Sequence, residues 1–499
     1  MKNPEFLIIG SGPGGSAAAL KLVRAGRRVL MIERGGFLPK EEANRDSNTV
    51  YGEKRYRTAE RWLNQERTEF QPWMHFYVGG NAKLYGSAHY RFRKADFQEI
   101  EYSDGTSPAW VINSGNLERY YDEAEALYHV HGQREADVTE PTERPYPLQP
   151  LEDEEGIATL KRGLDELGIS HLPLPLGVQL GQENEGFETD LTAFDAYPDP
   201  SLSKAEPEAC VLDRLEGEFF ELMTETEAVA FLSSGSEITG VKVKRGGGEE
   251  VLRADHYLCA AGAIQSAKLF LQSGPDRTFG NRSGLVGRNY MAHISTTTTA
   301  RFKEEIPDTF AKTFGSNHWY QPDAGGAVLG SIQTQGKWDA CQYGLEPWTH
   351  EKGSDLEHVA RHSLEFFFMT EDLPLKSNEV RVTAEGKVQI IRKLTNEKES
   401  RGIVDVFEEA LRNLPPGSLT LEEFRRQLLP VDWCTHQCGT LVFGEDPDFS
   451  VLDPWCRTHD FQNLHVVDAS FMPSSSALNP TLTIIANSLR VGERLAMEA

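Results

Sequence analysis

The chain has 499 residues and carries 51 Lys and Arg against 76 Asp and Glu, which gives a formal net charge of −25. This balance argues against a nucleic-acid partner, which needs clustered basic side chains, and fits either a solvated surface or a preference for a cationic substrate. No run approaches the ~18 apolar residues of a membrane span, and six cysteines are too sparse for a disulfide scaffold. We therefore expect a soluble, cytoplasmic protein without a membrane partner.

The N-terminal residues predict a dinucleotide-binding unit. Phe6–Ile9 is a short apolar strand, and a Gly-x-Gly-x-x-Gly turn follows it at residues 10–15. The pattern then predicts a helix over Ser16–Ala25, a second strand over Val29–Ile32 and an acidic residue, Glu33, directly after that strand. Strand, glycine turn, helix, strand and acid in this order are typical of a Rossmann-type unit.

Each residue type in this turn has a physical role. Gly10 permits the tight turn, Gly12 lets a pyrophosphate approach the backbone, and Gly15 lets the helix pack closely on the strand. The N-terminus of the helix then faces the phosphates. Glu33 can accept hydrogen bonds from a ribose diol and would repel the additional phosphate of NADP. We expect a bound dinucleotide.

The rest of the chain distinguishes between kinds of dinucleotide enzyme. A second glycine fingerprint and an early redox cysteine pair, both needed by disulfide-reductase flavoproteins, are missing from the sequence. The segment 246–248 is instead predicted to be the turn of a hairpin, with strands over Ile238–Lys244 and Glu250–Leu252. Electrons are therefore not expected to arrive from a second bound dinucleotide.

The remaining elements are interleaved along the chain. A helix is predicted over Asn116–Tyr128, and a small-residue strand end at 258–262 is typical of a strand that returns to a dinucleotide core. Alternating patterns at Thr296–Phe302 and Leu364–Thr370 predict an antiparallel sheet. After a strand predicted over Leu464–Ser470, a final helix is expected to run through Leu495.

Together with its C-terminal residues, these features make the sequence resemble the glucose-methanol-choline (GMC) oxidoreductases, which are FAD-dependent alcohol oxidases and dehydrogenases. The resemblance rests on the N-terminal fingerprint with Glu33, the segment from Gly79-Gly80 to Tyr90-Arg91, Ala260-Ala261-Gly262 with Gln265 and Ser266, and nearly everything from His436 onward. These sites are spread over most of the chain in the family's order. Residues 130–215 and 300–430 form the part that varies within the family and selects the substrate.

The resemblance implies an α/β fold, in which a Rossmann-like FAD-binding domain is interleaved with an α+β substrate domain built on an antiparallel sheet. The FAD-binding domain is expected to comprise 1–100, 211–293 and 434–499, and the substrate domain 101–210 and 294–433. Residues expected to bind FAD are Gly10, Gly12, Pro13, Gly14, Gly15, Glu33, Arg34, Gly79, Gly80, Asn81, Tyr85, Gly86, Val229, Ala260, Gly262, Asp468, Ala469, Pro480 and Thr481.

By the same resemblance, the catalytic residues are expected to be His436 and Asn479. Oxidation of an alcohol removes a proton from oxygen and a hydride from carbon, so a base that works near neutral pH must lie beside the flavin, and histidine suits this role. Asparagine does not titrate, but its amide can orient the hydroxyl or stabilise the developing alkoxide. No metal is expected.

Two features depart from the common pattern. Some family members attach FAD covalently through a histidine four residues after the second glycine of the Gly-Gly loop, and Leu84 stands at this position. FAD is therefore expected to be bound non-covalently, with His89 packing nearby. The pair Cys434 and Cys438 brackets His436, and we interpret both as packing thiols, because two further metal ligands at suitable spacing are missing.

The sequence contains no motif that identifies the substrate, so the expected substrate class follows from the acidic, hydrophilic composition of the chain. A polar, sugar-like or amino-sugar alcohol is favoured over an aryl or short-chain alcohol, and oxygen or another acceptor would reoxidise the flavin. A lyase that cleaves cyanohydrins without redox chemistry is an alternative on the same fold. Aromatic candidates for the pocket wall, each of which could equally be core, are His318, Trp319, Tyr320, His362, Phe366–Phe368 and Trp433.

Overall fold

A parallel five-stranded sheet forms the base of the cofactor-binding half of the molecule. The computed structural model describes residues 4–139, 144–215, 217–274, 278–320, 328–353, 355–433 and 435–498. The sheet order is β12 (Phe220–Met223), β2 (Val29–Ile32), β1 (Phe6–Ile9), β16 (His256–Cys259) and β24 (Leu464–Val466). β1, β2 and β24 are buried along their whole length, and β16 is buried from Tyr257 to Cys259, as their apolar runs require. The predicted strands 6–9 and 29–32 are confirmed.

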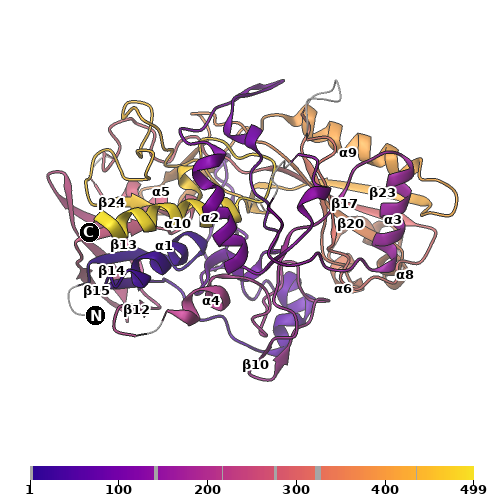
Figure 1. Cartoon of the computed structure of the whole chain (residues 1–499), viewed down its shortest axis with the longest axis horizontal. Coiled ribbons are helices and arrows are strands. Elements are labelled where there is room, and N and C mark those ends of the chain that lie inside the picture. The colour runs from indigo at the N-terminus through magenta and orange to yellow at the C-terminus, as the bar shows by residue number, and fades with distance from the viewer. Residues whose placement is uncertain are drawn as a thin grey trace.

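Three helices lie side by side next to this sheet (Figure 1). They are α1 (Pro13–Arg24), α2 (Ser114–Leu127) and α10 (Thr481–Glu498). α1 begins three residues earlier than predicted, because Pro13 is compatible with the first helical position and Gly12 is its N-cap. A Cβ on Gly492 of α10 would lie 3.0 Å from the backbone of Ala18, so the glycine allows α10 to approach α1 closely.

A three-stranded antiparallel sheet and α5 (Ala263–Gln272) complete this half. The sheet contains β13 (Glu227–Ser234), β14 (Glu237–Arg245) and β15 (Gly248–Leu252). Gly246 and Gly247, between β14 and β15, have φ angles of 55° and 80°. Two successive positive φ angles are characteristic of a tight hairpin turn, so the predicted turn is confirmed.

The other half is built on a six-stranded antiparallel sheet, seen on the right of Figure 1. Its order is β23 (Leu421–Leu428), β17 (Ile294–Phe302), β20 (Ser363–Thr370), β19 (Ser331–Thr334), β18 (Phe314–Ser316) and β8 (Leu172–Pro173). Phe366 and Phe368 of β20 pack against Phe407 of α9 (Glu397–Arg412), in a core that also includes α3 (Glu155–Glu166). The antiparallel sheet predicted from the alternating patterns is confirmed.

A small four-stranded sheet takes two strands from each of the two expected domains. It contains β21 (Glu379–Val382), β22 (Val388–Ile391), β3 (Trp62–Leu63) and β4 (Glu69–Phe70). The proposed boundaries between two domains therefore stay a prediction. The shorter elements are β5 (Ile100–Tyr102), β6 (Gly105–Ser107), β7 (Val130–His131), β9 (Leu176–Gly177), β10 (Glu183–Asn184), β11 (Phe187–Glu188), α4 (Pro207–Cys210), α6 (Ala340–Gly344), α7 (Pro347–Lys352) and α8 (Leu356–Arg361). Among the described residues, no helix is both long and apolar enough to cross a bilayer.

Candidate active site

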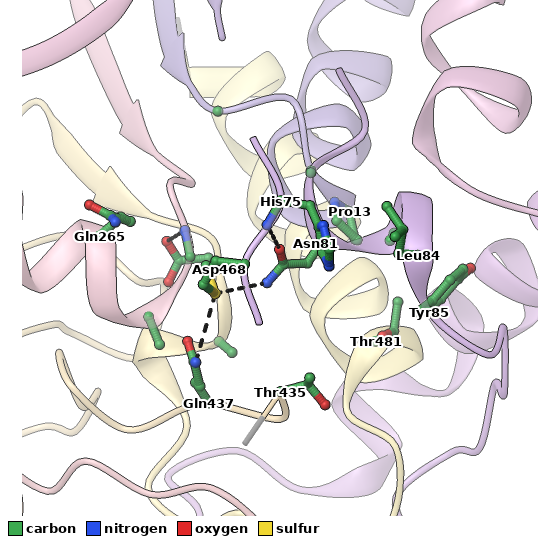
Figure 2. A pocket seen from close by; sticks show the side chains of 18 of the residues that line it. Pro13, His75, Asn81, Leu84, Tyr85, Gln265, Thr435, Gln437, Asp468 and Thr481 are labelled. Atoms are coloured by element: carbon green, nitrogen blue, oxygen red, sulfur yellow. Dashed lines mark hydrogen bonds between the residues drawn. The ribbon is translucent and has the colours of Figure 1, made fainter. Parts of the chain in front are cut away.

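One cavity brings together residues from all parts of the chain (Figure 2). It is lined by His436 and Asn479, the two expected catalytic residues. The expected cofactor residues that line it are Gly10, Gly12, Pro13, Gly14, Glu33, Arg34, Gly80, Asn81, Tyr85, Gly86, Ala260, Gly262, Asp468, Ala469, Pro480 and Thr481. The cavity therefore connects the glycine turn after β1 with the N-terminus of α10.

The glycine turn leaves its open side toward the cavity. Gly10 has φ +101°, and a Cβ there would lie 2.4 Å from the carbonyl oxygen of Ala260. A Cβ on Gly14 would lie 1.9 Å from the carbonyl oxygen of Val467. By contrast, the atom nearest to a Cβ on Gly12 would be the carbonyl oxygen of Gly79, at 4.0 Å. The space beside Gly12, at the N-terminus of α1, suits a pyrophosphate.

Glu33 lies at the end of β2 with its carboxylate buried. It accepts hydrogen bonds from the backbone N–H and Oγ of Ser11 at 3.1 and 2.7 Å and from the N–H of Gly35 at 3.1 Å. Burial raises the pKa of Glu33, and the bonds from Gly35 and Ser11 oppose that shift. Next to it, the guanidinium of Arg34 lies 3.8 Å from the ring centre of Phe76 and pairs with Glu60 at 2.8 Å.

Asp468 connects the strand ends of β16 and β24. Its carboxylate accepts from the N–H of Gly262 at 3.0 Å, from Oγ of Ser266 at 2.5 Å and from the N–H of Ser470 at 2.9 Å. Gly262, with φ +87°, makes the turn that brings its N–H to this carboxylate. Asp468 therefore holds two turns of the cavity wall together, in addition to lining the cavity itself.

Three expected cofactor residues do not line the cavity. Val229 stays a prediction: it lies at the register shift between Ala228 and Ala230 of β13, and the cavity is lined by the preceding residues 226–228. Gly15 acts inside the turn, where a Cβ would lie 2.1 Å from the carbonyl oxygen of Gly10. Gly79, with φ +96°, donates its N–H to Oγ of Ser11 at 3.1 Å.

The loop after Gly80 forms a further wall of the cavity and begins directly beside the glycine turn, since a Cβ on Gly80 would lie 3.2 Å from Cα of Gly12. The amide of Asn81 accepts from the N–H of His75 at 2.9 Å and donates to Sδ of Met74 at 3.2 Å, which Gln437 also approaches at 3.8 Å (Figure 2). These bonds anchor the loop to the preceding segment. A Cβ on Gly86 would lie 2.4 Å from Oδ1 of Asp195, so only glycine allows that carboxylate to pack here.

The residues near this loop determine whether a histidine is in position to attach the flavin covalently. Leu84 lines the cavity, whereas His89 is fully buried outside it, and burial lowers the pKa of His89 to about 3. His75, which no motif marks in the sequence, also lines the cavity. Its Nδ1 donates to the carbonyl oxygen of Tyr56 at 2.8 Å, and burial lowers its pKa to about 4.

We expect acid precipitation to release the flavin into the supernatant, because Leu84 offers no nucleophile at the position where some relatives attach FAD. The measurement is the absorbance of the flavin in the supernatant and in the washed pellet. Flavin that stays with the pellet would contradict the prediction, and His75→Gln would then test whether His75 forms the bond.

At the other end of the cavity, His436 is hydrogen-bonded in a fixed direction. Nε2 of His293 lies 3.2 Å from the carbonyl oxygen of Ser475, which can only accept, so Nε2 carries the proton of the neutral ring. Nδ1 of His293 then accepts from Nδ1–H of His436 at 2.9 Å. The free electron pair of His436 is therefore on Nε2, which lies 3.5 Å from Nδ2 of Asn479.

The electrostatic environment keeps His436 neutral. Burial, His293 and the charge of Lys312 lower the pKa of His436 well below its usual 6.5. Burial also lowers the pKa of His293, to about 4. Both rings are therefore neutral at pH 7, and His436 is ready to accept a proton at Nε2.

The aromatic candidates separate into two groups. Phe367 and Trp433 line the cavity, and the ring centre of Phe367 lies 6.1 Å from that of His436. Phe366 and Phe368 face the opposite side of β20, as the strand period requires, and lie in the core. The remaining candidates, which do not line the cavity, are His318, Trp319, Tyr320 and His362.

Of the two cysteines that bracket His436, the structure describes Cys438. Cys438 is buried, and burial raises the pKa of its thiol far above the usual range. Cys434 lies outside the described residues. Within the ranges that the structure describes, no group of three or more His, Cys, Asp and Glu side chains could hold a metal ion.

Several cavity residues escape sequence reasoning. Lys312, Gln333 and Gln335 line the cavity from segments without a recognisable motif. His293, which does not line the cavity but bonds to His436, lies 143 residues before it in the sequence. Their proximity results from the pairing of distant strands. The charged residues of the lining are nearly balanced: Glu33, Asp195, Glu227 and Asp468 against Arg34, Lys268 and Lys312. The net charge of −25 is therefore not concentrated in this cavity.

Comparison with known proteins agrees with this geometry. Family models described as GMC oxidoreductase match residues 31–295 and 379–488. Paromamine 6'-oxidase of Streptomyces fradiae is 28% identical over 515 residues, covering 99% of this chain and 91% of its own. 2-methyl-1,2-propanediol dehydrogenase of Mycolicibacterium austroafricanum is 28% identical over 544 residues, covering 99% of this chain and 95% of its own.

The fold is shared with solved structures as well. Pyridoxine 4-oxidase from "Mesorbium loti" superposes with a TM-score of 0.67 at 17% identity and covers 99% of both chains. The cavity fits FAD in its glycine turn, in the open space beside Gly12 and in the carboxylate of Glu33. The chain belongs to the GMC oxidoreductases and is an FAD-dependent alcohol oxidoreductase.

Proposed function

We propose that this enzyme oxidises a CH–OH group of a polar, sugar-like or amino-sugar alcohol, with His436 as the base and Asn479 as the residue that orients the hydroxyl. The proposal is supported chiefly by the direction of the His436 ring, whose unprotonated Nε2 lies beside Asn479 in the cavity that the glycine turn also lines. We further propose a cytoplasmic location, because six cysteines in this chain are too few for a disulfide scaffold.

In this proposal, the residues of the chain perform the proton chemistry. The substrate hydroxyl gives its proton to Nε2 of His436, while the amide of Asn479 orients the oxygen and stabilises the developing negative charge. Nδ1 of His293 accepts the hydrogen bond from Nδ1–H of His436, so the ring proton of His436 stays on Nδ1 and Nε2 remains free to accept. When bound, FAD supplies the acceptor for the hydride that leaves the carbon, so that the alcohol becomes a carbonyl compound.

The choice of a polar substrate is supported by the relatives and by the lining. One relative is named for paromamine and another for a propanediol, and both names favour a hydroxylated substrate. The polar side chains of the lining include Gln333, Gln335 and Lys312. The near balance of acids and bases in the lining gives no additional weight to a cationic substrate.

Anaerobic reduction of the flavin tests this function. The holoenzyme is mixed without oxygen with sugars, amino sugars, aryl alcohols and short alcohols, and the loss of the yellow absorbance is followed. We expect a sugar or amino sugar to bleach the flavin fastest, and admission of air then tests oxygen as the acceptor. A cyanohydrin-cleaving lyase would keep its absorbance throughout, and this outcome would overturn the proposal.

The pH dependence of kcat/KM tests the assignment of the base. Because the pKa of His436 is lowered, its base form is present at neutral pH and is lost only as the pH falls through that lowered pKa. We therefore expect kcat/KM for an uncharged alcohol to stay constant between pH 6.5 and 8 and to fall only well below pH 6.5.

His293→Leu is expected to lower kcat about fivefold, because His436 loses the acceptor that fixes its tautomer, and such a bond contributes ~1 kcal/mol. The acidic limb should also move toward pH 6.5, since His293 helps to lower the pKa of His436. His293→Gln, whose amide can bond to both neighbours, should restore most of the rate. Equal losses in both variants would indicate a role in packing instead.

A further inference from the structure

The antiparallel sheet presents two glutamines to the cavity from one strand. Gln333 lies in β19 and Gln335 follows it, and both line the cavity, as expected for positions two residues apart on a strand. Gln333 pairs in register with Phe367 of β20, whose ring lies beside His436. The two amides therefore lie on the wall that begins at the proposed base and extends away from it.

The amide oxygens of both glutamines have no hydrogen-bond donor among the residues that the structure describes. Gln333 is only 5% exposed, and its Oε1 is buried. Oε1 of Gln335 is buried in the same way, although its side chain is less covered. Buried carbonyl oxygens without donors are costly and rare in folded proteins, so these two point to a ligand that donates to them.

An ion pair beside the glutamines indicates which functional group of a ligand would bind there. Nζ of Lys312, which is 1% exposed, donates to Oδ2 of Asp195 at 2.5 Å and to the carbonyl oxygen of Thr334, between the two glutamines, at 3.3 Å. Both charged side chains line the cavity. Because the charges of Lys312 and Asp195 are paired with each other, this wall offers an ammonium group of a substrate no unpaired carboxylate. A hydroxyl group, which is neutral and both donates and accepts, suits this wall better.

We propose that Gln333 and Gln335 bind a hydroxyl group of the substrate other than the one that is oxidised, so that the enzyme selects polyhydroxylated alcohols over plain alkyl or aryl alcohols. The inference rests on the proposed function, because it assigns the reacting hydroxyl to His436 in the same cavity. A site built to hydrogen-bond a hydroxyl rejects the analogue that lacks it, since its buried acceptors are then left unpaired.

The test compares two primary alcohols that share a six-membered ring. Methyl glucopyranoside carries ring hydroxyls, and cyclohexylmethanol carries none. In Gln333→Leu and Gln335→Leu holoenzymes, we expect kcat/KM for methyl glucopyranoside to fall about 10²-fold or more, and that for cyclohexylmethanol to change less than about threefold. Among the mono-deoxy analogues of the glucoside, wild type and variant should converge for the analogue that lacks the bound hydroxyl.

Gln389→Leu is the matched control. Gln389 is a buried glutamine of β22 that donates to the carbonyl oxygen of Asn64 at 3.2 Å and does not line the cavity. Its replacement measures the general cost of losing a buried amide and should leave the ratio between the two alcohols unchanged. A loss in Gln333→Leu that is equal for both alcohols, or no loss for the glucoside, would overturn the inference.

A binding measurement separates this inference from the proposed function. Methyl glucopyranoside is titrated into each holoenzyme without oxygen, and the perturbation of the flavin spectrum gives its Kd. If neither alcohol bleaches the flavin, the proposed oxidation of a sugar-like alcohol is wrong, and binding alone decides the subsite. A Kd at least about tenfold weaker in the leucine variants supports the subsite, and equal binding in all proteins or none in the wild type overturns it.

Discussion

His436→Ala is expected to lower kcat by about 10² to 10⁴-fold while the protein keeps its yellow flavin. General base catalysis contributes about 3 to 5 kcal/mol to lowering a barrier, and the variant loses the proposed base, whose unprotonated Nε2 lies beside Asn479. Single-turnover reduction of the flavin by a substrate alcohol under anaerobic conditions measures this step directly.

The control for this variant is His362→Ala. His362 bonds to the carbonyl oxygen of Glu304 at 3.0 Å and lies outside the cavity, so its loss should leave flavin reduction unchanged. An unchanged rate of reduction in His436→Ala would remove His436 from the mechanism. Loss of the flavin itself in that variant would instead assign the residue to cofactor binding.

Gly12→Ala is expected to produce a folded protein that binds FAD about 10- to 100-fold more weakly. A Cβ at this position meets no protein atom closer than 4.0 Å, and the backbone φ of −68° accommodates alanine without strain. The added methyl group instead occupies the space that the pyrophosphate needs, and overpacking of this kind costs ~1 to 3 kcal/mol. Titration of apoprotein with FAD gives the affinity.

Two other glycines make this experiment specific. Gly36→Ala is the neutral control, because nothing lies within 4 Å of its Cβ and the residue does not line the cavity. Gly14→Ala should destabilise the apoprotein itself, since its Cβ would lie 1.9 Å from the carbonyl oxygen of Val467. Full FAD affinity in Gly12→Ala would show that the pyrophosphate does not pass this turn.

The sequence alone predicts those parts of the fold and of the site that depend on residues adjacent in the chain. The strands 6–9 and 29–32 and the turn at Gly246 and Gly247 follow from local apolar runs and from glycine's access to positive φ. The family motifs also identify most of the lining, because a turn that contacts a cofactor needs particular residues at fixed spacing.

Residues whose roles depend on distant strands could not be found in this way. His293 reaches His436 because β17, which begins at the next residue, and the segment around 436 are brought together by the fold, and no local pattern marks it. Gln333 faces the cavity through the pairing of β19 with β20.

The packing of α10 and β24 against the glycine turn has a consequence for biosynthesis. Val467 closes over Gly14, and Gly492 lies against Ala18, so the cradle for the pyrophosphate includes residues made long after the turn itself. A ribosome adding ~5 to 20 residues per second needs roughly 20 to 90 s to pass from one to the other. The complete cofactor site therefore forms only after translation of this region, and a nascent chain stalled before β24 has an incomplete site.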